Sequence, residues 1–134
     1  MSSSDDKKLF IWEYGVPVVT RHVSEPDMHT ITATAMHPSG EFYAGQSADN
    51  QVVIYENKGG NFRRIRAKKF DNHYCAGYAC AVDFSYDGQF LLSGDERGRI
   101  YCYDWKTGNY TDSIFKEFFV FKFIINYLND CLFR

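Results

Sequence analysis

The sequence has little net charge and lacks a long uninterrupted apolar run. Its 134 residues include 15 Lys or Arg and 17 Asp or Glu, which gives a formal net charge of -2. This balance gives no bulk electrostatic reason to bind nucleic acid. The longest apolar stretch, residues 118–128, is interrupted by Lys122 and Asn126. It falls short of the roughly 20 residues that a membrane helix needs, so we expect no membrane segment.

The sequence also lacks a cysteine pairing pattern and a secretory leader. The N-terminus, MSSSDDKKLF, has neither a basic region nor an apolar core. We therefore expect reduced thiols and an intracellular protein. The four cysteines are Cys75, Cys80, Cys102 and Cys131.

Motifs for catalysis are missing as well. No glycine loop of the phosphate-binding kind is present, and no nucleophile elbow. Ser85, Asp87 and His37 form a triad only if geometry is ignored, and Asp87 before a glycine is typical of a turn. We expect no enzyme activity, no cofactor and no small-molecule substrate.

One group of residues has the chemistry of a metal site but not the number of ligands. His73, Cys75 and Cys80 lie close together in the sequence. Zinc usually takes four nitrogen or sulfur ligands in paired spacings, and a fourth is missing here. We expect no metal site, and we interpret the cysteines as small apolar residues of a core.

Aromatic residues are abundant and indicate strands. Phe, Trp and Tyr make up 18% of the chain, with 12 Phe and 10 Tyr. Such side chains pack well on a pleated sheet, so we predict an all-β fold.

The chain contains an internal repeat. Residues 31–62 align without a gap on residues 79–110, and residues 5–13 match the third strand of the unit. The repeat periods of 48 and 43 residues are close to the length of a β-propeller blade. Polar and glycine-rich turns divide each unit into four strands. The predicted strands are 31–37, 42–46, 51–56 and 61–66 in one unit and 79–85, 90–94, 99–104 and 110–115 in the next.

We therefore predict about two and a half four-stranded blades of a propeller. Residues 1–28 form the end of one blade, residues 29–66 a second and residues 67–115 a third. A blade relies on its neighbours to bury both faces, so we expect the chain to be a fragment of a larger propeller.

An aromatic residue followed by an acidic one ends the third strand of each unit, as Trp12-Glu13, Tyr55-Glu56 and Tyr103-Asp104. This pair resembles the Trp-Asp dipeptide of WD-repeat proteins, whose blades contain a buried hydrogen-bonded network of His, Ser or Thr, Asp and Trp. The resemblance places His73, Ser93 and Tyr103 in that network, while Arg97 stands where the family has Asp. The residues with an implied structural role are His73, Ser93, Tyr103, Asp104, Asp49, Tyr55, Asp6 and Trp12.

Longer strings give a closer resemblance. SDDKKLFIWEYGVPV, SEPDMH, HPSGEF, QSADNQVVIY and AGYACAVDFSYDGQFLLSGDERGRIYCYDWKTG, in this order, are similar to the propeller of the pre-mRNA-processing factor 17 family. Two departures are Tyr86, where the family tends to have Pro, and Tyr103, where it has Trp.

The resemblance implies a nuclear, non-enzymatic WD40 scaffold of the spliceosome that acts around exon ligation. It implies spliceosomal proteins as partners, with contact to small nuclear RNA or pre-mRNA. The alternative is a WD-repeat adaptor of another complex, such as a substrate receptor of a ubiquitin ligase, because fold alone does not separate the two.

A basic run follows the third predicted strand of the middle unit. It contains Arg63, Arg64, Arg66, Lys68 and Lys69. These charges suit contact with RNA phosphates or recognition as a nuclear-import signal. The alternative is edge protection, since charges on an outer strand discourage pairing between sheets.

The repeat pattern fails near the C-terminus. Residues 116–134 lack the next repeat and are rich in Phe, Ile, Lys, Asn and Tyr. These residue types share A/T-rich codons, so our hypothesis is a translated intron or frame-shifted sequence. A genuine terminal cap is the alternative, because terminal repeats are often atypical.

Overall fold

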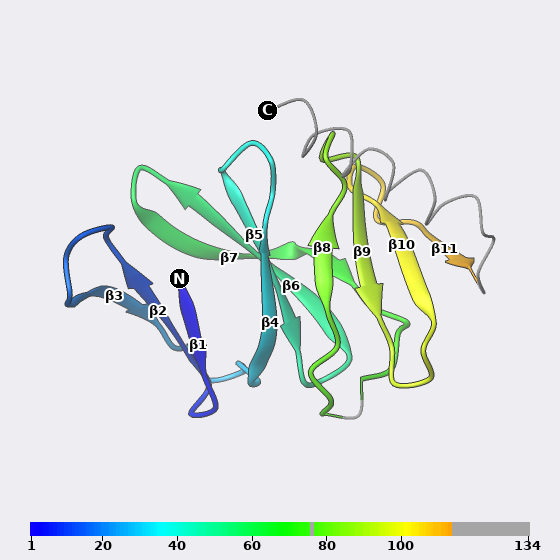
Figure 1. Ribbon diagram of the computed structural model, residues 1–134, viewed down its shortest axis with the longest axis horizontal. Coiled ribbons are helices and arrows are strands. Elements are labelled where there is room, and N and C mark those ends of the chain that lie inside the picture. The colour runs from blue at the N-terminus through cyan, green and yellow to red at the C-terminus, as the bar shows by residue number, and fades with distance from the viewer. Residues whose placement is uncertain (76, 114–134) are drawn as a thin grey trace.

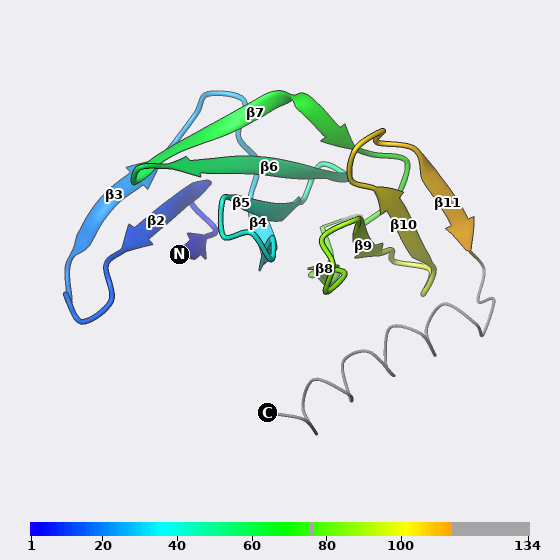
Figure 2. The same cartoon turned by 90° about the horizontal axis from the view of Figure 1, so that it is seen from above.

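A computed structural model describes residues 1–75 and 77–113, and every regular element in them is a β-strand. Three antiparallel sheets stand side by side like adjacent blades (Figures 1 and 2). The first sheet contains β1 (Ser2–Ser4), β2 (Lys8–Trp12) and β3 (Val19–Val23). The second contains β4 (Ile31–Met36), β5 (Phe42–Ser47), β6 (Gln51–Lys58) and β7 (Asn61–Phe70). The third contains β8 (Val82–Phe84), β9 (Phe90–Gly94), β10 (Ile100–Asp104) and β11 (Tyr110–Ser113).

The predicted all-β fold is confirmed for these residues, with the largest differences in strand length at β7 and β8. Strand β8 is shorter than the predicted 79–85, and β7 continues past residue 66, where we ended the blade, to Phe70. Strand β7 stays paired with β6 beyond a bulge, and its last residue, Phe70, is fully buried. Burial of that ring outweighs the low strand propensity of the preceding lysines. The tail at 116–134 and Cys131 lie outside the described residues.

Strand β6 is buried on both faces. Val52 and Ile54 belong to an apolar cluster shared with the third sheet, whereas Val53 and Tyr55 belong to one shared with the first. Successive side chains of a strand point to opposite faces, so a strand between two neighbouring sheets needs apolar residues at every position. This explains the unbroken apolar run VVIY in β6.

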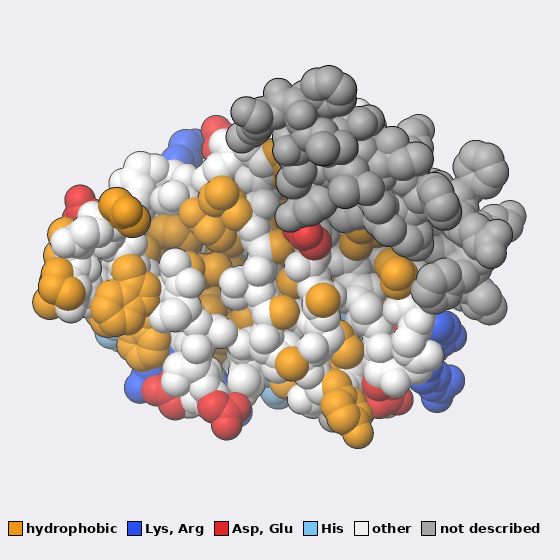
Figure 3. Space-filling view, viewed as in Figure 1, with side chains coloured by type: hydrophobic (Ala, Val, Ile, Leu, Met, Phe, Trp, Pro, Cys, Tyr) orange, Lys and Arg blue, Asp and Glu red, His pale blue; other side chains and the backbone are white. Residues whose placement is uncertain are grey.

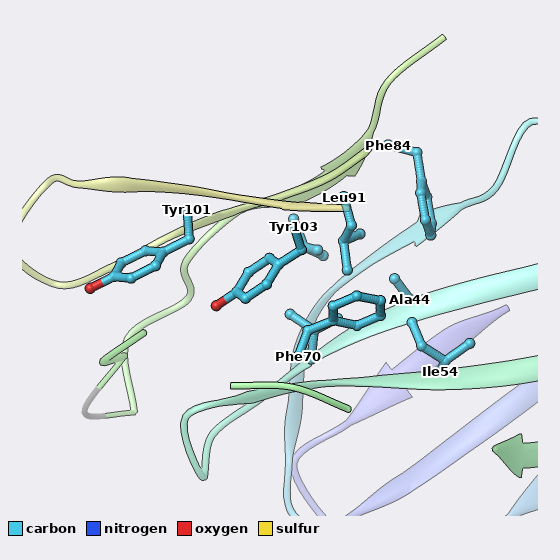
Figure 4. Close-up of a cluster of buried hydrophobic side chains, with 9 residues drawn as sticks. Ala44, Ile54, Phe70, Phe84, Leu91, Tyr101 and Tyr103 are labelled. Atoms are coloured by element: carbon cyan, nitrogen blue, oxygen red, sulfur yellow. The ribbon is translucent and has the colours of Figure 1, made fainter. Parts of the chain in front are cut away.

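The larger cluster joins the second and third sheets (Figure 4). Burial of each large apolar side chain contributes about 1.5–3 kcal/mol relative to exposure. Phe70 and Tyr103 meet here in an edge-to-face contact with ring centroids 5.4 Å apart. The buried members are Ala44, Val52, Ile54, Phe70, Val82, Phe84, Leu91, Tyr101 and Tyr103.

Trp105 closes one end of this junction. Its ring lies 5.0 Å from the ring of His37 and 5.3 Å from that of Phe84, measured between centroids. His37 accepts a hydrogen bond from the Ser39 backbone at Nδ1, so Nε2 carries the proton and donates to the Gly88 carbonyl at 3.1 Å. The turn after β4 is therefore tied to the turn after β8.

The first sheet leaves much apolar surface exposed. Large hydrophobic side chains gather over the β2–β3 hairpin in the left part of Figure 3. The exposed side chains of this hairpin are Trp12, Tyr14, Val16, Val18 and Val19. A search of the described residues for a long apolar helix of membrane-spanning length finds none.

Candidate functional site: a buried polar network and a basic strand

His73, Ser93 and Tyr103 lie around one buried polar network between the second and third sheets. All three side chains are buried, and the Nδ1 atom of His73 lies 2.8 Å from the hydroxyl of Tyr103. Tyr103 donates its own proton to the backbone carbonyl of Asp71 at 2.6 Å, so its oxygen accepts from Nδ1. Nε2 of His73 is therefore left as an acceptor.

Gln46 completes this network from the neighbouring sheet. The fully buried amide donates from Nε2 to His73 Nε2 at 2.7 Å, and its oxygen accepts from Ser93 Oγ at 2.7 Å. The same amide nitrogen lies 3.0 Å from Cys75 Sγ. One consistent set of protons satisfies every pair, which is the condition under which a buried network stabilises a fold.

The network favours neutral groups. Burial lowers the pKa of His73 below its ordinary value, although the carboxylates of Asp95 and Asp71 act in the opposite direction. Burial also raises the pKa of Tyr103 above its ordinary value. The geometry therefore supplies bracing between two sheets, with both side chains uncharged at neutral pH.

Sequence reasoning did not find Gln46, because it sought every member of the network within one repeat. The WD-repeat resemblance also places the acidic residue of the turn at position 97, where this chain has Arg97. The carboxylate that organises this turn is Asp95, whose Oδ1 accepts from the backbone N–H of Arg97 at 2.9 Å and of Arg99 at 2.8 Å. Arg99 Nε adds an ion pair with Asp95 Oδ2 at 2.8 Å. Asp95 therefore organises this turn through Arg97 and Arg99, whereas position 97, where the WD-repeat family has the network Asp, carries Arg97.

The corresponding aromatic of the second sheet has different surroundings. Tyr55 is fully buried, and within the described residues its hydroxyl has no hydrogen-bond partner. Burial raises the pKa of Tyr55 to about 12. Asp49 accepts from Gln51 Nε2, and its carboxylate lies 3.8 Å from His29 Nε2. The structure therefore places no network like that of His73 around Tyr55.

The remaining three predicted structural residues make local contacts. Trp12 is 44% exposed and donates from Nε1 to Ser2 Oγ at 2.8 Å. Asp6 pairs with Lys8 at 2.9 Å. Asp104 accepts from backbone N–H groups of the turn that follows β10. The eight predicted residues thus belong to separate blades and do not form one site.

The basic run lies on β7, the outer strand of the second sheet (Figure 2). Arg63 pairs with Glu56 at 3.3 Å. Lys68 lies over the ring of Trp105, with Nζ 3.4 Å from the centroid, which is cation–π geometry. Lys69 is exposed.

The other two arginines of the run contact acidic residues of the loop that joins β3 to β4. Arg64 Nη1 lies 3.3 Å from Asp27 and 3.9 Å from Glu25. Arg66 Nη2 lies 3.0 Å from Glu25 and 3.3 Å from Asp27. Within residues 1–75 and 77–113, no group of three or more potential ligands is placed to hold a metal ion.

Comparison with known proteins gives a consistent picture. The family model WD40, described as WD domain, G-beta repeat, matches residues 65–104. Pre-mRNA-processing factor 17 of Homo sapiens and of Mus musculus are each 44% identical over 107 residues, covering 80% of this chain but 18% of those proteins. The Saccharomyces cerevisiae protein of that name is 33% identical over 114 residues, covering 85% of this chain and 25% of that protein. WD repeat-containing protein 25 of Mus musculus is 21% identical over 106 residues.

The chain spans a quarter or less of the length of the pre-mRNA-processing factor 17 relatives that it matches. The match to the WD40 model and the adjacent four-stranded antiparallel sheets agree on the fold. The chain is therefore built of WD40 repeats, as part of a β-propeller, and is similar to the WD-repeat region of pre-mRNA-processing factor 17.

Proposed function

We propose that this chain is part of a non-enzymatic scaffold that functions in pre-mRNA splicing in the nucleus. The observation that carries the proposal is 44% identity over 80% of the chain to proteins named pre-mRNA-processing factor 17. The buried network and the two apolar clusters support it, because they hold neighbouring blades rigidly and leave the loops to contact partners. Spliceosomal proteins are the proposed partners.

The finer proposal is a role around exon ligation. A propeller offers several loop faces at once, which suits a component that holds parts of an assembly during a rearrangement. The eight predicted structural residues are proposed to brace the individual blades and not to contact partners, since most of their polar groups bond within the chain.

Direct RNA contact is proposed through the outer strand β7. Arg63, Arg66 and Lys69 are exposed. Arg63 pairs with Glu56, Arg64 and Arg66 pair with acidic residues of the β3–β4 loop, and Lys68 packs on an indole ring. The same charges also protect the strand edge from pairing with another sheet. Because most of the cations already have partners, protein contacts come first in this proposal and RNA second.

Affinity purification of the tagged endogenous gene product from nuclear extract tests the proposal. We expect co-purification of small nuclear RNAs and of lariat intermediates, measured by primer extension, relative to an untagged extract. Recovery of ubiquitin-ligase subunits without small nuclear RNA would contradict it and support the adaptor alternative.

A nuclease step separates the two kinds of contact. After digestion of RNA on the beads, a protein scaffold retains its protein partners. Loss of every partner on digestion would show that the chain is held through RNA alone, which contradicts a scaffold based on protein contacts.

A further inference from the structure

An acidic turn lies directly against the basic strand. Glu25 and Asp27 belong to the loop between β3 and β4, and their carboxylates contact the guanidinium groups of Arg64 and Arg66 on β7. All four possible pairings lie between 3.0 and 3.9 Å. Two positive charges of the run are thus neutralised by one short loop.

The two sides of this contact differ in burial. The Arg64 side chain is 9% exposed and that of Glu25 is 24% exposed, whereas Arg66 and Asp27 are 66% and 55% exposed. The turn is closed by a hydrogen bond from Met28 N to Glu25 O at 3.0 Å, and Met28 is buried between the first and second sheets. The turn is therefore anchored by Met28, while its two carboxylates contact the arginines of β7.

We propose that the turn formed by Glu25 and Asp27 is an internal cap on an anion-binding site made by Arg64 and Arg66, and that single-stranded RNA competes with the cap for these arginines. This inference uses the RNA partner proposed above. It assigns the regulation of that contact to the chain itself.

The chemistry of the ligand follows from the cap. Guanidinium groups bind carboxylate and phosphate oxygens through the same planar donor geometry, so the two carboxylates occupy positions that suit two phosphate groups. Arg63 is 78% exposed at its side chain and Lys69 is also exposed. Displacement of the cap would release Arg64 and Arg66 on the strand that also carries the exposed Lys69 and Arg63, of which Arg63 pairs with Glu56.

The cap competes with any external anion for Arg64 and Arg66. The carboxylates are held in the same molecule, so they compete at a high effective concentration with any external anion. The capped chain should bind RNA weakly, and a partner that engages the acidic turn should strengthen RNA binding. Arg66 is freed first because it is exposed, and Arg64 only when the turn moves.

The test is RNA binding by purified 134-residue chains, measured by fluorescence anisotropy with a labelled 12-nucleotide oligouridylate. The isosteric double variant Glu25→Gln/Asp27→Asn removes the charge of the cap. We expect it to bind at least about tenfold more tightly than wild type, since two charge-assisted contacts become available. Its dependence on salt should be steeper by about 1.4 in logarithmic slope, roughly 0.7 for each additional phosphate contact.

Matched variants make the result specific. Glu13→Gln/Glu41→Gln removes two exposed carboxylates elsewhere and changes net charge by the same amount. Equal tightening in both double variants would overturn the proposal, because it would show a general charge effect. Adding Arg66→Gln to the uncapped variant should abolish most of the gain, and a gain that persists would also overturn it.

A further comparison covers the case in which the double variant does not fold, as judged by circular dichroism. Asp27→Asn alone alters a half-exposed side chain and should give an intermediate affinity. Arg66→Gln in the wild-type chain should leave RNA affinity unchanged within about twofold, because this arginine is already occupied; a larger loss would contradict the cap. A negative result in these RNA-binding assays would overturn the cap but would not change the expected result of the nuclear purification. The two proposals can therefore be refuted independently.

Discussion

Replacement of Gln46 by methionine tests the buried network most directly. Methionine has nearly the same length and removes the amide without a large change in volume. The change takes away the donor to His73 Nε2 and the acceptor for Ser93 Oγ, which lie at 2.7 Å each. Ser93 retains a longer contact, 3.3 Å, to the carbonyl of Gly94, but His73 loses its partner at Nε2.

The expected cost is dominated by the imidazole nitrogen. A buried acceptor without a partner costs about 1–3 kcal/mol, and the lost hydrogen bond from Ser93 adds about 1 kcal/mol. We therefore expect the free energy of unfolding to fall by about 2–4 kcal/mol. For a urea dependence of about 2 kcal/mol per molar, this lowers the midpoint by roughly 1–2 M.

Urea denaturation followed by tryptophan fluorescence measures this change, because Trp105 lies at the junction that the network braces. The control is Gln89→Met, which makes the same chemical change on an exposed side chain and should cost less than about 0.5 kcal/mol. Equal midpoints for the two variants would refute the assignment of a structural role to Gln46.

Three further predictions concern the same junction. Burial lowers the pKa of His73 in the folded chain, so the unfolded chain binds a proton more readily. The contribution of His73 to stability should be complete above about pH 6.5, the pKa of an unfolded histidine, and should be lost as the pH falls to the lower pKa of the folded chain. Urea midpoints measured between pH 4.5 and 8 should show this step in the wild-type chain and not in a His73→Asn variant. Gly88→Ala places a Cβ 2.5 Å from Nε2 of His37 at a φ of +68°, and it should destabilise the chain by about 2–4 kcal/mol in thermal melting. The control Gly98→Ala, where φ is +74° and the space around the Cβ is open, should cost about 1 kcal/mol. Trp105→Ala should cost about 3–5 kcal/mol in the same melts, and Trp12→Ala, at a site 44% exposed, distinctly less.

The repeat made the strands predictable. Turn residues bound each strand in the sequence, and strand β9 spans Phe90–Gly94 as expected. The residue at which β7 ends could not be predicted in this way, because a basic run is equally typical of an outer strand and of a loop. The pairing of Lys69 and Phe70 with β6 shows that the strand continues, and the buried ring of Phe70, which contacts the next sheet, explains why.

Contacts between blades were not predictable from a pattern within one blade. Gln46 is a fully buried polar residue on strand β5, and glutamine is not among the His, Ser or Thr, Asp and Trp of the WD-repeat network. Its role depends on the distance between two sheets, which a single repeat does not encode. The signal that was available is the polar side chain itself, since a polar residue in an otherwise buried strand requires a partner.

The two complete repeats use different chemistry at equivalent positions. In the alignment, Tyr55 corresponds to Tyr103 and Gly45 to Ser93. Extending the same 48-residue offset upstream of the aligned residues places Glu25 opposite His73. A side chain at Gly45 would meet Ile31 at 3.0 Å, so apolar packing fills the space that a hydroxyl occupies in the other repeat.

Glu25 forms ion pairs with Arg64 and Arg66 of β7, whereas His73 of the next repeat bonds to a tyrosine. The junction of the first two sheets thus combines apolar burial with ion pairs, of which salt screens the exposed pair of Arg66 and Asp27 most. The junction of the last two relies on neutral hydrogen bonds, which salt affects little. A repeat that exchanges a neutral network for ion pairs places charge at the surface, where a polyanion can compete for it. The departure of the middle repeat from the WD pattern is for this reason the part of the chain in which we place a binding function.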